Sequence, residues 1–199
     1  MDFKAKISKE ELSACPAEVF NGRAYVIQTV ADAEKAVRFL KTQSVVGFDT
    51  ETKPSFVKGK SNQVALMQIS TEDVCFLFRL SVIGMPRILS DFLNDQTVMK
   101  IGLSLRDDFR ALNKRAAVEP ANFLDLQNYV KTFGIEENSL TKIYAILFGK
   151  RISKAQRLSN WEAALLTERQ IGYAALDAWA TRQIFVHLHS MQNNMIHNV

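Results

Sequence analysis

The chain is poor in cysteine, with only Cys15 and Cys75 among its 199 residues and no CxxC spacing. This pattern excludes a disulfide framework and a cysteine-rich zinc site. Both thiols are therefore expected to be reduced and structural. We expect an intracellular, cytoplasmic protein, and a location in the nucleoid or the nucleus stays open.

Long hydrophobic runs are also absent. No stretch approaches the roughly 20 apolar residues that span a bilayer, and the charged segment MDFKAKISKEEL lacks the apolar core of a secretory signal. We therefore expect no membrane partner. Glycine and proline are scarce, at 8 and 4 residues, and they form no linker. The chain predicts one domain over residues 22–191, with an arm over 1–21 and a frayed tail over 192–199.

Neither sign of charge is in large excess. The 25 Lys and Arg residues oppose 21 Asp and Glu residues, which leaves a net charge of +4. This balance is compatible with a nucleic-acid partner, but it requires that any basic surface be local. Two clusters could form such a surface or could be solvated loop charge: Lys53, Lys58 and Lys60, and then Lys150, Arg151, Lys154 and Arg157.

Short apolar segments and amphipathic segments alternate along the chain. β-Branched and aromatic runs predict strands, whereas apolar residues at i, i+3, i+4 and i+7 predict helices. The expected strands are AYVIQTV, SVVGFDT, QVALMQIS, VCFLFRL, TVMKIG and NFLD, with TED as a hairpin turn. The expected helices follow Thr29, begin near Ile88, Ser104, Leu126 and Leu140, and run from Thr167 to about Met191. Three antiparallel strands followed by strand–helix alternation predict an α/β domain, with a mixed sheet of five to six strands flanked by helices.

Two acidic residues lie at the end of a predicted buried strand, in VVGFDTE. Side chains alternate between the two faces of a strand, so Asp49 and Glu51 share one face. This end of a strand is where α/β sheets usually bind ligands. A solvated strand end would carry the same two acids, so this motif by itself does not establish a metal site.

The segment KIGLSLRDDFRAL carries two neighbouring acids. At about 100° per residue, Asp108 lies roughly 70° from the centre of the apolar stripe, and Asp107 lies roughly 170° from it. Asp108 is thus predicted to reach the sheet and Asp107 to face solvent. Both acids also suit the first turn of a helix, where the helix dipole favours negative charge. Asp107 remains the alternative candidate.

Tyr173 and Asp177 are four residues apart in IGYAALDAWATRQI, so they stack on one helix face. The same face carries Ala180, Ile184 and Leu188, which predicts that it is buried or lines a cleft. An acid buried there needs a partner. A Tyr–Asp hydrogen bond would meet that need, but three acidic motifs at the ends of core elements are better explained by a catalytic site that holds divalent cations.

Taken in order, Asp49-x-Glu51, Asp108 and Tyr173-x-x-x-Asp177 resemble the DEDDy group of 3′–5′ exonucleases, which have the ribonuclease H-like fold. The segments GFDTETKPSF, NQVALMQIS, GKRISKAQRLSNW and LTERQIGYAALDAWATRQIF are most similar to the Werner-type exonuclease domain, within the ribonuclease D-like superfamily. The resemblance extends over roughly residues 22 to 190 and includes motif order and spacing, which is more specific than any one motif.

The resemblance implies a catalytic set of Asp49, Glu51, Asp108, Tyr173 and Asp177, in which the four acids are metal ligands. It implies two divalent cations, Mg²⁺ or Mn²⁺, about 4 Å apart. Asp49 would bridge both cations, Glu51 and Asp177 would complete the first, and Asp108 would hold the second. Tyr173 would hydrogen-bond the attacking water or an oxygen of the scissile phosphate.

The implied activity is hydrolysis of nucleic acid from a free 3′ end to 5′-mononucleotides, with DNA favoured over RNA. Candidate substrate contacts are basic or aromatic side chains near the motifs, namely Lys53, Phe56, Lys58, Lys60, Lys154 and Arg157. Phe56 also suits core packing, Trp161 is predicted to be a packing anchor, and Asp125 suits either support of the site or a turn cap. Two alternatives stay open: a ribonuclease D-like enzyme that trims structured RNA, and a non-catalytic nucleic-acid-binding module.

Overall fold

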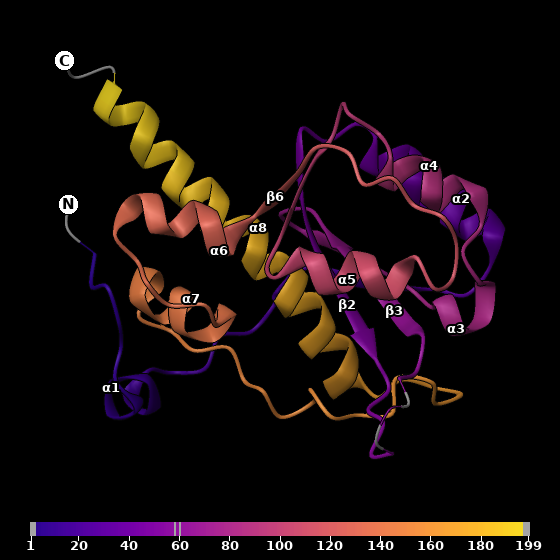
Figure 1. Ribbon diagram of the computed structural model, residues 1–199, viewed down its shortest axis with the longest axis horizontal. Helices are drawn as coiled ribbons and strands as arrows, with labels where there is room; N and C mark the ends of the chain where they lie inside the picture. Colours follow the sequence, from indigo (N-terminus) through magenta and orange to yellow (C-terminus); the bar gives the residue numbers. More distant parts are fainter. Residues whose placement is uncertain (1–2, 58, 60, 197–199) are drawn as a thin grey trace.

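The computed structural model describes residues 3–57, 59 and 61–196. Within these residues, six strands form one sheet in the order β1-β4-β3-β2-β5-β6. The strands are β1 (Arg23–Ile27), β2 (Val45–Thr52), β3 (Val64–Ser70), β4 (Val74–Phe78), β5 (Met99–Gly102) and β6 (Phe123–Asp125). The helices are α1 (Lys9–Ala14), α2 (Val30–Leu40), α3 (Leu80–Ile83), α4 (Arg87–Leu93), α5 (Leu105–Leu112), α6 (Leu126–Tyr129), the 3₁₀ helix η1 (Val130–Phe133), α7 (Leu140–Phe148) and α8 (Glu168–Ile196). The predicted α/β class with a mixed, helix-flanked sheet is confirmed (Figure 1).

The sheet combines antiparallel and parallel pairs. β2, β3 and β4 pair antiparallel, and the predicted TED turn joins β3 to β4. β1, β5 and β6 follow helical or looped connections and pair in parallel with β4, β2 and β5 respectively. The predicted strand VCFLFRL is too long, because β4 ends at Phe78 and α3 begins at Leu80. Between them the buried side chain of Arg79 turns to bind carbonyl oxygens of a distant segment.

Helices cover both faces of the sheet (Figure 1). On one face α2, α4 and α5 share a single apolar cluster with Val46 and Phe48 of β2. On the opposite face α8 packs over β2, β3, β4 and β5, and α7 packs against α8. β2 contacts the helices on both faces of the sheet because its side chains alternate between these faces.

α8 lies unusually close to β2 at Gly47. A Cβ atom added to Gly47 would lie 1.8 Å from the carbonyl oxygen of Ala178 and 2.8 Å from Thr181 Oγ1. Ala174 and Ala178 are fully buried and add little bulk on the facing side of the helix. Because Gly47 has no side chain, α8 can pack close to β2. This short distance between helix and strand also determines how far Asp177 lies from the sheet.

α8 begins where the sequence predicts and ends later. The Gln170 N–H donates to Thr167 Oγ1 at 3.3 Å and the Thr167 N–H donates to Gln170 Oε1 at 3.0 Å, and these two bonds form a capping box. The helix continues to Ile196, so the predictions of an end near Met191 and of a frayed tail from residue 192 are wrong for residues 192–196. Each residue added to an existing helix gains a backbone hydrogen bond, and this outweighs the weak helix propensity of asparagine. Residues 197–199 of that predicted tail lie outside the described residues.

The N-terminal arm lies against the domain and contains α1. Glu18 accepts hydrogen bonds from Tyr144 Oη at 2.9 Å and from Lys150 Nζ at 3.1 Å. Ala17 forms a β-bridge with Arg151. Lys150 and Arg151 thus hold the arm, which leaves Lys154 and Arg157 of the second basic cluster for other partners.

Both cysteines are free thiols, and Cys75 is buried. Among the described residues, none of the helices combines the length and the hydropathy that crossing a bilayer demands.

Candidate active site

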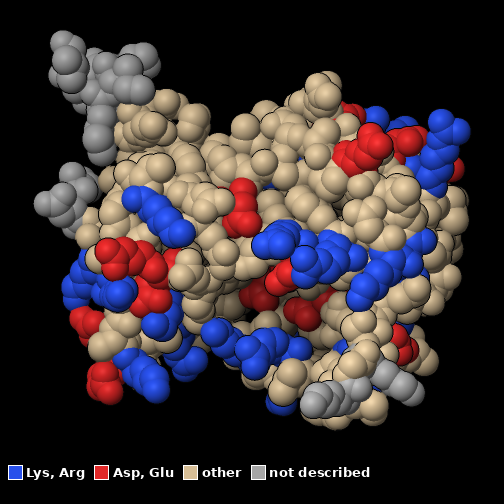
Figure 2. All heavy atoms as spheres, viewed as in Figure 1, with Lys and Arg blue, Asp and Glu red and all other residues tan. Residues whose placement is uncertain are grey.

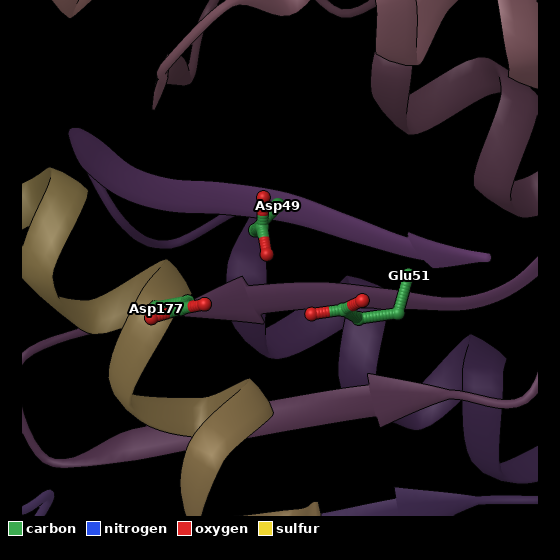
Figure 3. A group of neighbouring side chains, drawn as sticks. All are labelled: Asp49, Glu51 and Asp177. Atoms are coloured by element: carbon green, nitrogen blue, oxygen red, sulfur yellow. The ribbon is translucent and has the colours of Figure 1, made fainter. Parts of the chain in front are cut away.

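Three carboxylates from distant parts of the chain converge beside β2 (Figure 3). Asp49 and Glu51 project from β2 and Asp177 projects from α8, and one oxygen of each lies within 4.8 Å of the others. Glu51 and Asp177 are buried, and Asp49 is partly buried. The structure therefore brings together the first and third sequence motifs.

Two local features place these side chains. Alternation along β2 directs Gly47, Asp49 and Glu51 to the face that α8 covers. On α8, Tyr173 precedes Asp177 by one turn on the predicted buried face. Because α8 approaches β2 closely at Gly47, the carboxylate of Asp177 comes within ligand distance of those on β2.

The second motif lies next to this group but outside it. Asp108 accepts a short hydrogen bond from the Thr50 hydroxyl, and it is not among the carboxylates within 4.8 Å of one another. The side chain of Asp107 is 83% exposed and pairs with Arg110 at 3.6 Å. The prediction that Asp107 faces solvent is confirmed, which leaves Asp108 as the candidate from this motif.

Asp125 fixes the start of α5 and therefore the position of Asp108. Its carboxylate accepts hydrogen bonds from the backbone N–H groups of Ser104 at 3.1 Å, Leu105 at 3.0 Å and Gln127 at 2.9 Å. Ser104 has a φ of 61°, a left-handed conformation that is costly for a residue with a side chain. Asp125 stabilises that conformation, so it acts both as a cap and as a support for the site.

Burial raises the pKa of all four acids, and repulsion within the group adds to the increase for Asp49 and Glu51. Burial, with added repulsion from Asp177 and Asp108, raises the pKa of Glu51 to about 9. Burial also raises the pKa of Asp177 and of Asp108 to about 7 each. For Asp49, burial and then repulsion from Asp177 and Glu51 raise the pKa well above its usual value. Such carboxyl groups hold protons near neutral pH unless a cation replaces them.

The donor set fits a hard divalent cation. Carboxylate oxygens are the side-chain ligands that Mg²⁺ and Mn²⁺ prefer. In the part of the chain that the structure describes, none of the four acids forms an ion pair with Lys, Arg or His. Asp177 Oδ1 is buried without a hydrogen-bond partner. A buried carboxylate that lacks a counter-charge is costly, and a cation among these oxygens would remove that cost.

Tyr173 stands beside Asp177 and packs against Trp161. The centroids of the two aromatic rings lie 6.0 Å apart, and Trp161 is fully buried. The prediction that Trp161 is a packing anchor is therefore confirmed. Burial, reinforced by the charges of Asp177 and Glu51, raises the pKa of the Tyr173 hydroxyl. This hydroxyl stays protonated and can donate a hydrogen bond into the site.

Arg79 supports the site, although the sequence alone does not indicate this role. Its guanidinium donates hydrogen bonds to the carbonyl oxygens of Ala163 and Ala164, the latter at 2.7 Å. These bonds hold the segment that carries Trp161. No sequence pattern marks the residue, because an arginine after a strand is ordinarily solvated. The contact of Thr50 with Asp108 was also missed, although its place inside the DTE motif could have suggested it.

Basic side chains border the acidic group. Lys154 and Arg157 line a pocket of about 140 Å³ together with Tyr173 and Asp177. Figure 2 shows acidic atoms recessed in a hollow, with basic side chains over α5 on one side and basic side chains on the segment between α7 and α8 on the other. An acidic recess with positive edges suits a phosphate backbone whose scissile group is held by cations.

The other candidate substrate contacts are Lys53, Phe56, Lys58 and Lys60. Lys53 pairs with Glu162 at 3.4 Å. Phe56 is 87% exposed, which contradicts the alternative that it packs in the core and leaves base stacking as its candidate role. Lys58 and Lys60 lie outside the described residues.

We expect the metal-free protein to lose thermal stability as the pH rises from about 5 to about 8. The folded chain retains protons on Asp108 and Asp177, whose pKa values are about 7, whereas the unfolded chain has released them above about pH 4. A pKa raised by folding stabilises the folded state most at low pH, and this contribution is lost as the pH passes the folded value. The Tm in EDTA should therefore fall over this range, and Mn²⁺ should raise it more at the upper end.

The matched variant for this measurement is Asp49→Asn. It removes one carboxyl group whose pKa is raised by burial in the folded chain, so its Tm in EDTA should change less with pH than that of the parent protein. A parent Tm that is equal at both ends of the range would contradict the assigned pKa directions.

Comparison with known proteins gives one consistent family. Residues 25–193 match a family model described as 3′–5′ exonuclease. The chain is 29% identical over 186 residues to a 3′–5′ exonuclease of Arabidopsis thaliana, covering 85% of this chain and 65% of that protein. It is 33% identical over 147 residues to the bifunctional 3′–5′ exonuclease/ATP-dependent helicase of Mus musculus, covering 71% of this chain and 10% of that protein.

A solved structure shows the same fold. The crystal structure of RNase D from Escherichia coli, described as an exoribonuclease involved in structured RNA processing, matches with a TM-score of 0.76 at 21% identity. The match covers 84% of this chain and 44% of that one. The chain spans less than two thirds of the length of each of these three proteins.

Proposed function

Since the chain belongs to the 3′–5′ exonuclease family, we propose that it hydrolyses nucleic acid from a free 3′ end and releases 5′-mononucleotides. The observation that carries the proposal is the convergence of Asp49, Glu51 and Asp177 within 4.8 Å, with Tyr173 one turn away on α8. Hard oxygen ligands beside a protonated hydroxyl suit the hydrolysis of a phosphodiester.

Two divalent cations, Mg²⁺ or Mn²⁺, are the proposed cofactors. Asp49, Glu51 and Asp177 would hold one cation, and Asp49 with Asp108 would hold the second. When bound, such cations lower the pKa of a coordinated water and neutralise charge on the transferring phosphoryl group. Thr50 and Asp125 keep Asp108 near this centre through their hydrogen bonds to Asp108 and to the start of α5.

The remaining residues would bind and orient the substrate. The Tyr173 hydroxyl would donate a hydrogen bond to the attacking water or to an oxygen of the scissile phosphate. Lys154 and Arg157, which border the same pocket, would contact backbone phosphates without regard to sequence. Phe56, exposed at the end of the first motif, would stack on a base.

DNA is the proposed preferred substrate. The Werner-type segments around the motifs and the 33% identity to the mouse exonuclease–helicase protein support this choice. RNA trimming is the second candidate, because the RNase D structure shares the fold with a TM-score of 0.76. At 21% identity that likeness concerns the fold alone.

Digestion of DNA and RNA strands of one sequence tests both candidates. With Mg²⁺ or Mn²⁺, a 3′ label should leave at once as a mononucleotide, and a 5′-labelled strand should shorten to a ladder. DNA should be degraded at least about tenfold faster than RNA. This ratio corresponds to a difference of about 1.4 kcal/mol in the activation free energy. Faster loss of RNA would favour the second candidate. Intact strands with every cation would refute nuclease activity altogether.

A further inference from the structure

Gln68 is a fully buried polar residue for which the structure offers no hydrogen-bond partner. It is 0% exposed, and both its Nε2 and its Oε1 atoms lack a partner within the described residues. Buried side-chain amides are nearly always hydrogen-bonded, because a buried donor and acceptor that have lost water are costly. The buried, unpartnered amide of Gln68 therefore lowers the stability of the fold unless it gains a hydrogen-bond partner.

The position of Gln68 in the sheet places it beside the carboxylate group. Gln68 lies in β3 directly opposite Asp49 of β2 in the antiparallel register. Residues directly opposite in such a pair have side chains on the same face, with Cβ atoms about 5 Å apart. The amide of Gln68 and the carboxylate of Asp49 are therefore neighbours beneath α8, which packs over both strands.

The other neighbours of Gln68 do not supply a partner. On its second side in the sheet it faces Leu77 of β4. Along β3 the residues on the same face are Leu66, which is apolar, and Ser70, whose hydroxyl already donates to the Thr71 carbonyl oxygen at 3.0 Å. α8 covers this region with alanines of the apolar cluster that includes Leu66 and Leu77. Of these neighbours, Asp49 lies directly opposite Gln68 and carries a carboxylate, which is the strongest hydrogen-bond acceptor among them.

We propose that Gln68 is a positioning residue of the metal centre, whose amide N–H₂ donates a hydrogen bond to the Asp49 carboxylate when the centre holds a divalent cation. The inference rests on the proposed function, since it concerns the metal-loaded state. A hydrogen bond donated to Asp49 fixes the orientation of its carboxylate toward the cations and favours the ionised form, because each carboxylate oxygen can accept a hydrogen bond and also bind a cation. A neutral amide does this without a positive charge, whereas a lysine at the same place would compete with the cation.

The test replaces Gln68 by methionine, which has a similar length and volume but no hydrogen-bonding amide. The Gln68→Met variant should bind Mn²⁺ about tenfold more weakly than the parent in isothermal titration calorimetry, in keeping with the usual effect of losing a partner of a metal ligand. Its Tm in EDTA should be equal to or higher than that of the parent, because an unsatisfied polar group has been removed from the interior. A role in folding alone would give the reverse, with a lower Tm and unchanged affinity.

Two controls make the outcome specific. Gln63→Met makes the same chemical change at an exposed position just before β3, and its Mn²⁺ affinity should match that of the parent. If Gln68→Met does not fold, Gln68→Leu is titrated in its place with the same expectation. Affinity within twofold of the parent in the folded variant overturns the inference.

Failure of this inference and failure of the proposed function give different results. If the parent binds Mn²⁺ and degrades strands while the Gln68 variant binds Mn²⁺ equally well, only the role of Gln68 is refuted. If the parent neither binds Mn²⁺ nor degrades a strand, the proposed function is refuted and the inference falls with it.

Discussion

Replacing Asp49 by asparagine should reduce strand cleavage by about 10³-fold or more while leaving the fold intact. We propose that Asp49 binds both cations. An oxygen of its carboxylate lies within 4.8 Å of ligand atoms on Glu51 and Asp177. Asparagine keeps the shape but has one oxygen and no charge, so it cannot bridge two cations. Several kcal/mol of transition-state stabilisation are lost with a metal, and each 1.36 kcal/mol is a factor of about ten in rate.

The measurement is release of a 3′ label under single-turnover conditions, together with binding of the uncleaved strand. Binding should persist, because the variant removes a negative charge beside a polyanion and leaves Lys154 and Arg157 in place. Asp107→Asn is the matched control, since that side chain is 83% exposed and pairs with Arg110 on the same helix. Cleavage by Asp49→Asn within tenfold of the parent, or an equal loss in Asp107→Asn, would contradict the assignment.

The largest effect on stability is expected from Gly47→Ala. The new Cβ would lie 1.8 Å from the Ala178 carbonyl oxygen, so either β2 or α8 must shift. The contact is with backbone rather than with a flexible side chain, and we expect a loss of about 3 kcal/mol or more in the free energy of unfolding. For a domain of this size the Tm should fall by about 6 to 12 °C. Urea and thermal unfolding measure both quantities.

Gly172→Ala is the control for this substitution. Gly172 lies within α8, and a Cβ there would meet no atom within 4 Å. The alanine should therefore leave stability unchanged or raise it by up to about 1 kcal/mol through its higher helix propensity. Gly47→Ala should also weaken Mn²⁺ binding, because a displaced α8 carries Asp177 away from Asp49. A Gly47→Ala protein as stable as the parent would show that the spacing between α8 and β2 is not set at this position.

Patterns local to one segment were predicted from sequence with success. The predicted helix after Thr29 forms, and Thr29 accepts a hydrogen bond from the Asp32 N–H at 3.1 Å. The helix predicted to begin near Leu140 also forms, and it ends at Gly149 with a φ of 66°. The orientation of Asp107 and Asp108 followed from the helical repeat alone. These features depend on the dihedral preferences and hydrogen bonds of a few neighbouring residues, so the sequence of the segment is sufficient to predict them.

Features that depend on distant contacts were missed or misjudged. The sequence could not show that Arg79 binds the segment around Trp161 or that Phe56 is exposed. A side chain is exposed or buried according to which other segments pack against it. The periodicity of its own segment does not contain that information.

The amino-acid sequence by itself determined which side chains carry the chemistry and which of them share a face. Asp49 with Glu51, and Tyr173 with Asp177, are paired by the periods of strand and helix. Only the tertiary structure decided how far apart the pairs lie, that Thr50 holds Asp108 beside the group, and that Gln68 is buried opposite Asp49 without a partner. The physical reason is that repeat geometry acts over a few residues, whereas register between strands and the depth of helix packing arise from contacts between segments far apart in the chain.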